Sequence, residues 1–178
     1  EEYGNRLWAF TSLDLSAQQV HRIGLDQVAR LEVEYRQIAG PVIGSTSLAE
    51  IYGRLRDDPA LHYRDADTLV ADASRALDRA TAATGAWFGI APVASCTANP
   101  TTHGSLAFYS PPSREGTKGG AFFFNVADPS AWGTYQLESV TFHEGVPGHH
   151  FQIALAQELP DLHPILAEYL VAAYSEGW

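Results

Sequence analysis

The sequence predicts an α+β fold that is mostly helical, with a small sheet of about three strands. Two observations predict it. Apolar residues recur at helical spacing through the first 86 residues, each run opening on a capping residue. Between residues 87 and 126 the chain is instead rich in aromatic and β-branched residues that Gly, Pro, Asn and Ser interrupt, a pattern typical of short strands.

The first predicted helix opens on a capping box. Ser16 stands three residues before Gln19, and an apolar stripe follows for about twenty residues until Gly40-Pro41 should end the helix. The stripe consists of Val20, Ile23, Val28, Leu31, Tyr35 and Ile38.

Two more helices are expected in the first half. Ser47 with Glu50 repeats the capping pattern before a short helix that ends at Asp57-Asp58-Pro59. A third helix is expected over Asp67–Thr84, with Gly85 beyond its end. Its inward residues should be Leu69, Ala73, Ala76, Leu77 and Ala80.

The strands come next. They are expected over Ile90–Cys96, Ser105–Ser110 and Ala121–Val126, with the polar loop "PPSREGTKGG" between the last two. A helix is expected from about Thr134, and a last one from about Pro164 to the end of the chain.

Composition limits the functional class. The chain has 178 residues and a net charge of −10, which disfavours binding to nucleic acid or to an anionic membrane. No run of apolar residues is long enough to span a bilayer, and the single cysteine, Cys96, cannot form an internal disulfide, so the compartment stays open. The chain lacks Met and stops at Trp178 inside an expected helix. We therefore expect residues 1–178 to be one segment of a larger domain, with a helical part (1–86) and a part holding the sheet and the last helices (87–178).

The segment "FHEGVPGHH" contains the residues that could form a metal site. On a straight helix, His143 would lie about 9 Å along the axis from His149 and about 10.5 Å from His150, too far to share a metal ion. Pro147 should distort the helix and Gly148 should allow the distorted backbone. A bulge of two residues would return one of the later histidines to the position four residues after His143.

The expected site is a zinc site. His143 and either His149 or His150 would bind one Zn²⁺ per chain, Glu144 would take a proton from the attacking water, and Glu176 would be the third ligand. A polar helix face is the alternative interpretation, but the surrounding residues are largely apolar, and burying such groups without a purpose is costly. Two histidines and a carboxylate can also bind Fe(II), although the neighbouring general base favours hydrolysis.

These residues resemble a known family. "LESVTFHEGVPGHHFQ" followed by "AAYSEGW" is similar to the signature of the domain of unknown function 885 family, which is mostly bacterial and predicted to contain zinc metallopeptidases of the His-Glu type. "LAFYSPPSREGTKGGAFFFNVADP" also resembles the family's middle region. The resemblance implies a peptidase from a family whose members are longer than this chain. We expect the small sheet to lie beside the metal-binding helices. Because Gly-His often closes the helix motif of zinc peptidases, the resemblance favours His149 as ligand and leaves His150 beside the metal ligands or facing substrate.

Five further residues are weaker candidates. The strand Ala121–Val126 could pair with an extended peptide, with Asn125 at its end, although core sheet and a turn cap are the simpler interpretation. Tyr109 could polarise a carbonyl, although a packed tyrosine is the simpler interpretation. Glu138 could orient a metal ligand, although a position on a surface helix explains it more simply. Arg114 and Lys118 could bind a substrate carboxylate, although a solvated loop is the simpler interpretation.

The sequence therefore predicts zinc-dependent hydrolysis of peptide bonds, with a peptide as the partner. A non-catalytic protein that binds peptides is the alternative from another class, and hydrolysis of a non-peptide amide is a third. Substrate, cleavage specificity and oligomeric state do not follow from the sequence.

Overall fold

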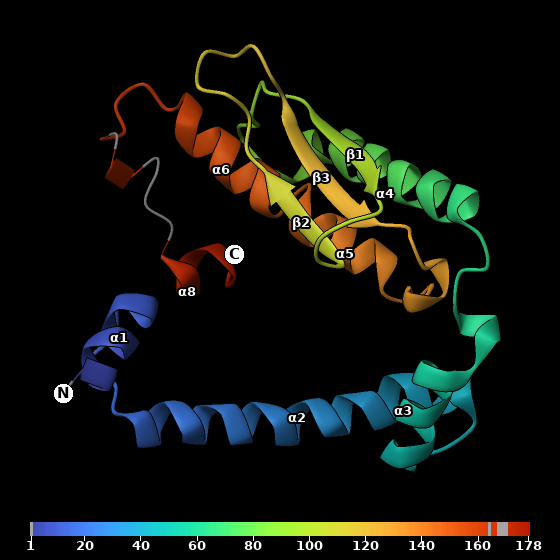
Figure 1. Cartoon of the computed structure of the whole chain (residues 1–178). Coiled ribbons are helices and arrows are strands. Elements are labelled where there is room, and N and C mark those ends of the chain that lie inside the picture. Colours follow the sequence, from blue (N-terminus) through green and yellow to red (C-terminus); the bar gives the residue numbers. More distant parts are fainter. Residues whose placement is uncertain (1, 164, 167–170) are drawn as a thin grey trace. The chain divides into compact units, whose positions relative to one another are not determined.

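The computed structural model describes residues 2–163, 165–166 and 171–178 (Figure 1). Its strands are β1 (Cys96–Thr101), β2 (Ala107–Ser110) and β3 (Gly120–Asn125). Its helices are α1 (Glu2–Thr11), α2 (Ala17–Ile43), α3 (Leu48–Asp57), α4 (Ala66–Trp87), α5 (Leu137–Glu144), α6 (His149–Glu158) and α8 (Ala172–Ser175), with 3₁₀ turns at Pro59–Leu61 and Pro129–Ala131. The fold is α+β and mostly helical, as predicted.

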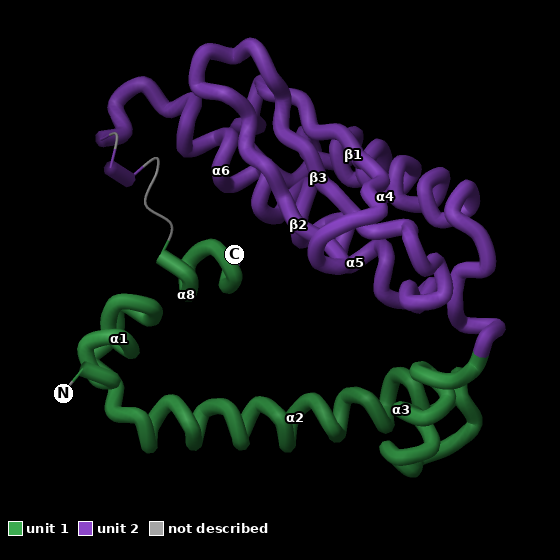
Figure 2. The backbone as a smooth tube through the Cα atoms, in the orientation of Figure 1, with its two compact units in different colours: residues 1–58, 171–177 green, residues 59–170, 178 purple. Residues whose placement is uncertain are grey.

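The chain forms two compact units (Figure 2). Unit 1 comprises residues 1–58 and 171–177, and unit 2 comprises residues 59–170 and 178. The boundary therefore lies before α4, which belongs with the sheet and not with the helices that precede it.

In unit 1, α2 begins as predicted and ends later. Ser16 and Gln19 form the capping box, with the Gln19 amide donating to Ser16 Oγ at 3.3 Å. The predicted end at Gly40-Pro41 is wrong. Pro41 removes only its own hydrogen bond within the last turn, and the helix stops where Gly44 adopts a left-handed φ of 80°.

The short helix α3 has the predicted bounds but a different cap. Ser47 makes no side-chain capping bond. Ser45 instead donates its hydroxyl to Glu50 and accepts the amide of Ser47 at 3.0 Å. The helix α1 has no counterpart in the sequence prediction.

In unit 2, α4 carries most of the predicted inward face. Leu69, Ala73, Ala76 and Leu77 are buried, whereas Ala80 is only partly buried. The helix begins after Asp65, whose side chain accepts the Thr68 amide, and runs on to Trp87, so Gly85 lies inside it.

The sheet has the order β1-β3-β2, with β3 parallel to β1 and antiparallel to β2. The first strand starts at Cys96, where the sequence prediction ended it. Val93 and Ala94 lie before it, and their amides donate to the carboxylate of Glu158. Pro100 lies within β1 and is tolerated because β1 is an edge strand.

The helices α4, α5 and α6 all contact the sheet, and the core lies between them and β3 (Figure 1). Phe122 and Phe124 are fully buried and pack with Trp132, whose indole N–H donates to Asn125 O at 2.7 Å. On the opposite face of the sheet, Phe123 stacks on Phe108 with ring centroids 4.9 Å apart. This packing fixes β3 as the central strand beside the last helices.

Candidate metal centre

The predicted single helix through "FHEGVPGHH" is two helices. α5 ends at Glu144 and α6 begins at His149, so the expected bulge is a complete break. Across the break, the Gly148 amide donates to Phe142 O at 2.9 Å, six residues back, and the His150 amide donates to Gly145 O at 3.1 Å, five residues back. The Val146–Pro147 peptide bond is cis. The break replaces regular helical hydrogen bonds with wider turns.

Two glycines are required for this backbone. A Cβ on Gly148 would lie 2.0 Å from His143 O, and a Cβ on Gly145 would lie 2.8 Å from Thr141 O, and both of these oxygens belong to the backbone. No side chain fits at either distance. The glycines therefore allow the close approach of the α6 start to the α5 end.

The break brings His143 and His149 together. Their ring centroids are 4.4 Å apart, and they present a pair of ring nitrogens within 4.8 Å of each other. Two nitrogens on one tetrahedral Zn²⁺ lie about 3.4 Å apart, so small side-chain rotations suffice for shared ligation. His143 is exposed and His149 is partly buried, so the pair faces accessible space on one side.

His150 has a different environment. Its side chain is 2% exposed, its Nε2 lies 3.0 Å from Ala94 O and its Nδ1 lies 2.9 Å from the Tyr109 hydroxyl. Since a carbonyl only accepts, Nε2 carries the proton and Tyr109 donates to Nδ1. Burial lowers the pKa of His150, which favours this neutral form.

Tyr109 and Gly120 complete that arrangement. Burial raises the pKa of Tyr109, so its hydroxyl remains a donor. A Cβ on Gly120 would lie 2.4 Å from His150 Nδ1 and 2.6 Å from the Tyr109 hydroxyl. Sequence reasoning missed the roles of Ala94 and Gly120; the Gly119-Gly120 pair opening β3 was the available signal, because glycine in a strand often marks a close approach.

Glu144 is the last residue of α5 and is partly buried next to His143. Glu176 follows α8 directly and belongs to unit 1. Two residues later, Trp178 belongs to unit 2, and its indole N–H donates to Pro147 O at 2.6 Å.

Two weaker candidates lie elsewhere. Glu138 forms an exposed ion pair with Arg79 of α4, which agrees with the interpretation of this residue as part of a surface helix. Asn125 accepts the Ala127 amide at 2.9 Å and donates to Gly104 O at 3.4 Å, so it caps a turn.

The strand that was a candidate for peptide pairing is core sheet, which was the simpler interpretation of its sequence. β3 is paired on both sides and offers no free edge. β2 is an edge strand, and its Tyr109 ring lies 6.5 Å from the His149 ring. β2 is therefore the free strand beside the histidine pair.

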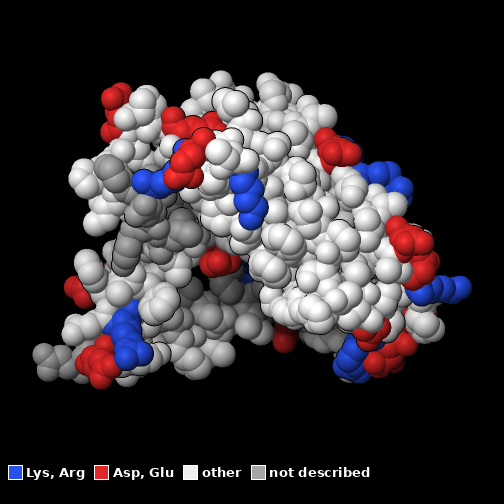
Figure 3. All heavy atoms as spheres, turned by 45° about the horizontal axis from the view of Figure 1, so that its top comes forward, with Lys and Arg blue, Asp and Glu red and all other residues white. Residues whose placement is uncertain are grey.

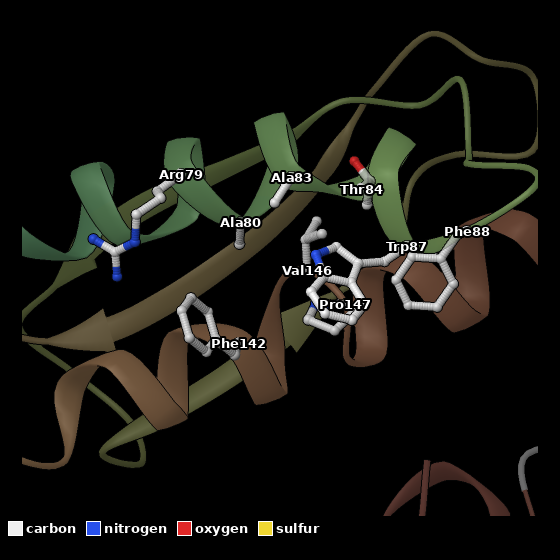
Figure 4. Close-up of a pocket in the computed structure, with 9 residues that line it drawn as sticks. All are labelled: Arg79, Ala80, Ala83, Thr84, Trp87, Phe88, Phe142, Val146 and Pro147. Carbon is white, nitrogen blue, oxygen red and sulfur yellow. The ribbon is translucent and has the colours of Figure 1, made fainter.

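An apolar cavity of about 510 Å³ lies between α4 and α5 (Figure 4). Phe142, Val146 and Pro147 face it from the α5 side, and Trp87 and Phe88 close one end. His143 and Glu144 do not line it. The cavity is thus distinct from the histidine pair.

Among the described helices, none combines the length and apolar character needed to cross a lipid bilayer.

Comparisons with known proteins identify the chain's relatives. No curated protein matches the chain. A solved structure described as "the crystal structure of the putative lipoprotein from Colwellia psychrerythraea" matches 99% of this chain and 32% of its own, with a TM-score of 0.91 and 27% identity. The chain thus spans about a third of that protein. A family model matches residues 1–178, and the chain therefore belongs to the family described as bacterial protein of unknown function (DUF885).

Proposed function

We propose that the protein hydrolyses peptide bonds with one zinc ion held by His143, His149 and Glu176. The convergence of His143 and His149 across the break carries this proposal, because a straight helix would separate them by about 9 Å. The break between α5 and α6 loses regular helical hydrogen bonds and requires two glycines. Bringing two metal ligands together would explain why the chain keeps such an unfavourable local structure.

The choice of His149 over His150 follows from the hydrogen bonds. Both nitrogens of His150 are engaged, one by Tyr109 and one by Ala94. Binding a metal through either nitrogen would break one of these bonds inside the core. The ring of His149 lies against that of His143, with centroids 4.4 Å apart.

Glu176 is proposed as the third ligand on chemical grounds. Two histidines and one carboxylate are the protein ligands of many catalytic zinc sites. Glu176 stands two residues before Trp178, whose indole is anchored to Pro147 in the break itself. Consecutive Cα atoms are 3.8 Å apart, so Glu176 stays within about 8 Å of the Trp178 backbone.

Zn²⁺ would supply Lewis-acid polarisation of the substrate carbonyl and would make water more acidic. Glu144, next to His143, would take the proton from the attacking water and return it to the leaving amine. The edge strand β2 would hold the extended peptide by main-chain hydrogen bonds, because its outer edge is unpaired in the sheet. His150 would position the start of α6 and would not contact the reacting atoms.

Elemental analysis tests the proposal. Wild-type protein supplied with zinc should hold about one zinc per chain, and His143→Ala, His149→Ala and Glu176→Ala should each hold much less. Glu144→Gln should keep the zinc and lose at least about 100-fold in peptide hydrolysis, the usual size of a general-base contribution. Glu138→Gln is the matched control and should change neither quantity. Folded wild-type protein that takes up no zinc would refute the proposal.

A further inference from the structure

A second cavity, of about 690 Å³, lies in unit 2 at the end of α6 away from the break. It is formed by the segment before β1, by the loop between β2 and β3, and by Gln157 and Glu158 of α6. Three charged side chains line it, Arg114, Lys118 and Glu158, whereas Arg79 is the one charged residue among those labelled in the cavity of Figure 4.

The loop wall of this cavity is held in one conformation by Ser113. Its hydroxyl oxygen accepts the amides of Thr117 and Lys118 at 3.0 and 2.9 Å, and its own amide donates to Lys118 O at 2.9 Å. Gly116 provides the left-handed turn with a φ of 69°. The loop therefore presents Lys118 from a fixed backbone.

The facing wall is fixed by Glu158. Its two carboxylate oxygens accept the amides of Val93 and Ala94 at 2.7 and 2.8 Å. Both oxygens are thus used to join α6 to the segment before β1. Glu158 stabilises the cavity and is not a salt-bridge partner of Lys118.

Lys118 is unusual in this protein. It is the only lysine in a chain with a net charge of −10. Seven arginines form salt bridges, whereas Lys118 forms none with any residue in the described ranges. Most basic groups on the face drawn in Figure 3 accordingly lie beside acidic ones. Lys118 is exposed at the cavity wall, so its ammonium group can be reached by an anion from outside.

The charge of the lining selects the kind of anion. Two cations and one carboxylate leave a net charge of +1 on the described lining. A carboxylate, with one negative charge, matches this charge, whereas a phosphate dianion exceeds it and is repelled more strongly by Glu158. Lysine and arginine form charge-assisted hydrogen bonds with carboxylates, and these are stronger than neutral ones.

The cavity is also within reach of the histidine pair. Ala94, which lines it, accepts the hydrogen bond from His150. Gln157 stands eight residues after His149 on α6, which corresponds to about 12 Å along the helix axis. An extended peptide covers that distance with three to four residues.

We propose that this cavity binds a carboxylate group of a peptide ligand, with Lys118 and Arg114 as the recognising cations. The carboxylate is either the C-terminus of the peptide or an acidic side chain. The binding requires no metal and no hydrolysis, so it can be tested separately from the function proposed above.

Binding to the EDTA-treated full chain tests the inference. The probes are two pairs of acetylated tetrapeptides: Ala₄ with a free or an amidated C-terminus, and amidated Ala₄ with one Glu or one Gln inside. Dissociation constants come from NMR titration, with the amides of Ser113, Gly116 and Gly119 as reporters of the cavity. Each probe is titrated into wild type, Lys118→Gln, Lys118→Arg and the control Arg22→Gln, which removes one positive charge from an exposed position on α2 in unit 1.

One probe with a carboxylate should bind at least tenfold more tightly than its uncharged counterpart and shift the three reporters. Lys118→Gln should remove that preference, Lys118→Arg should restore most of it, and Arg22→Gln should change it less than twofold. The preferred pair then identifies the source of the carboxylate. Equal binding of charged and uncharged probes would overturn the inference, as would equal losses in Lys118→Gln and Arg22→Gln.

Discussion

At the scale of single residues, close contacts at Gly148 and His150 fix the backbone of the candidate metal centre. Gly148 lies where a Cβ would overlap the carbonyl of His143, and His150 fills both of its hydrogen bonds inside the core. These residues control the geometry without touching a substrate. Substitutions there should therefore reveal how the break is maintained.

Gly148→Ala should destabilise the protein by roughly 1–3 kcal/mol, the usual cost of forcing an extra group into a packed site. It should also weaken zinc binding, because His149 is the next residue. Gly24→Ala in α2 is the control. Its Cβ would meet nothing within 4 Å, so alanine should be neutral or slightly stabilising in that helix. Urea denaturation measures both, and equal stability of the two variants would contradict the contact.

Tyr109→Phe should cost roughly 1–3 kcal/mol of unfolding free energy, because it leaves His150 Nδ1 buried without its donor. Zinc content should stay unchanged if His150 is not a ligand. Tyr3→Phe, at a position 66% exposed, should have no effect on stability. A loss of zinc with unchanged stability would assign Tyr109 and His150 to the metal site instead.

Cys96 gives a prediction of pH dependence. Burial raises the pKa of its thiol to about 11 from 9.0. The raised pKa means that the neutral thiol stabilises the fold below pH 9.0, and this stability is lost as pH rises towards 11. Because the thiolate is the nucleophile, iodoacetamide should alkylate native Cys96 slowly at pH 8 and faster with each unit up to about 11. The urea-unfolded chain is the control, and a native rate that levels off by pH 9 would contradict a buried thiol.

At the scale of elements, position in the sheet decides which strand is available. β3 carries a run of apolar residues, and because these residues are buried in the core, β3 is the central strand of the sheet. The edge beside His149 is β2, whose residues gave a weaker signal. Helix caps also depend on their surroundings. The capping box of α2 is formed as predicted, whereas in α3 the hydroxyl that bonds Glu50 belongs to Ser45 and not to the predicted Ser47.

The cap of α3 can be tested by a matched pair. Ser45→Ala should destabilise unit 1 by about 0.5–1 kcal/mol, because Ser45 bonds both Glu50 and the Ser47 amide. Ser47→Ala should cost less, since its hydroxyl makes no capping bond. Circular dichroism at 222 nm during urea unfolding measures both. The opposite order would restore Ser47 as the functional cap.

At the scale of the whole molecule, zinc should stabilise the folded state if it binds there preferentially. Free zinc at 100 times its dissociation constant would add about 2.7 kcal/mol and raise the melting temperature. Differential scanning fluorimetry with added zinc and with EDTA measures the shift. His143→Ala should abolish it, whereas His21→Ala on α2 should keep it; an unchanged shift in His143→Ala would place the zinc elsewhere.

The sequence by itself determined the α+β class, the helices that local signals define, and the residues of the candidate site. Capping boxes, apolar periodicity and the spacing of "FHEGVPGHH" are local properties, and local interactions suffice to express them. Only the tertiary structure decided which strand is central, that the helix breaks completely between Glu144 and His149, and that His150 is held by Tyr109 and Ala94. The environment of His150, for example, depends on partners 41 and 56 residues away in the chain. No local pattern encodes such distant contacts, because packing selects them only once the elements meet.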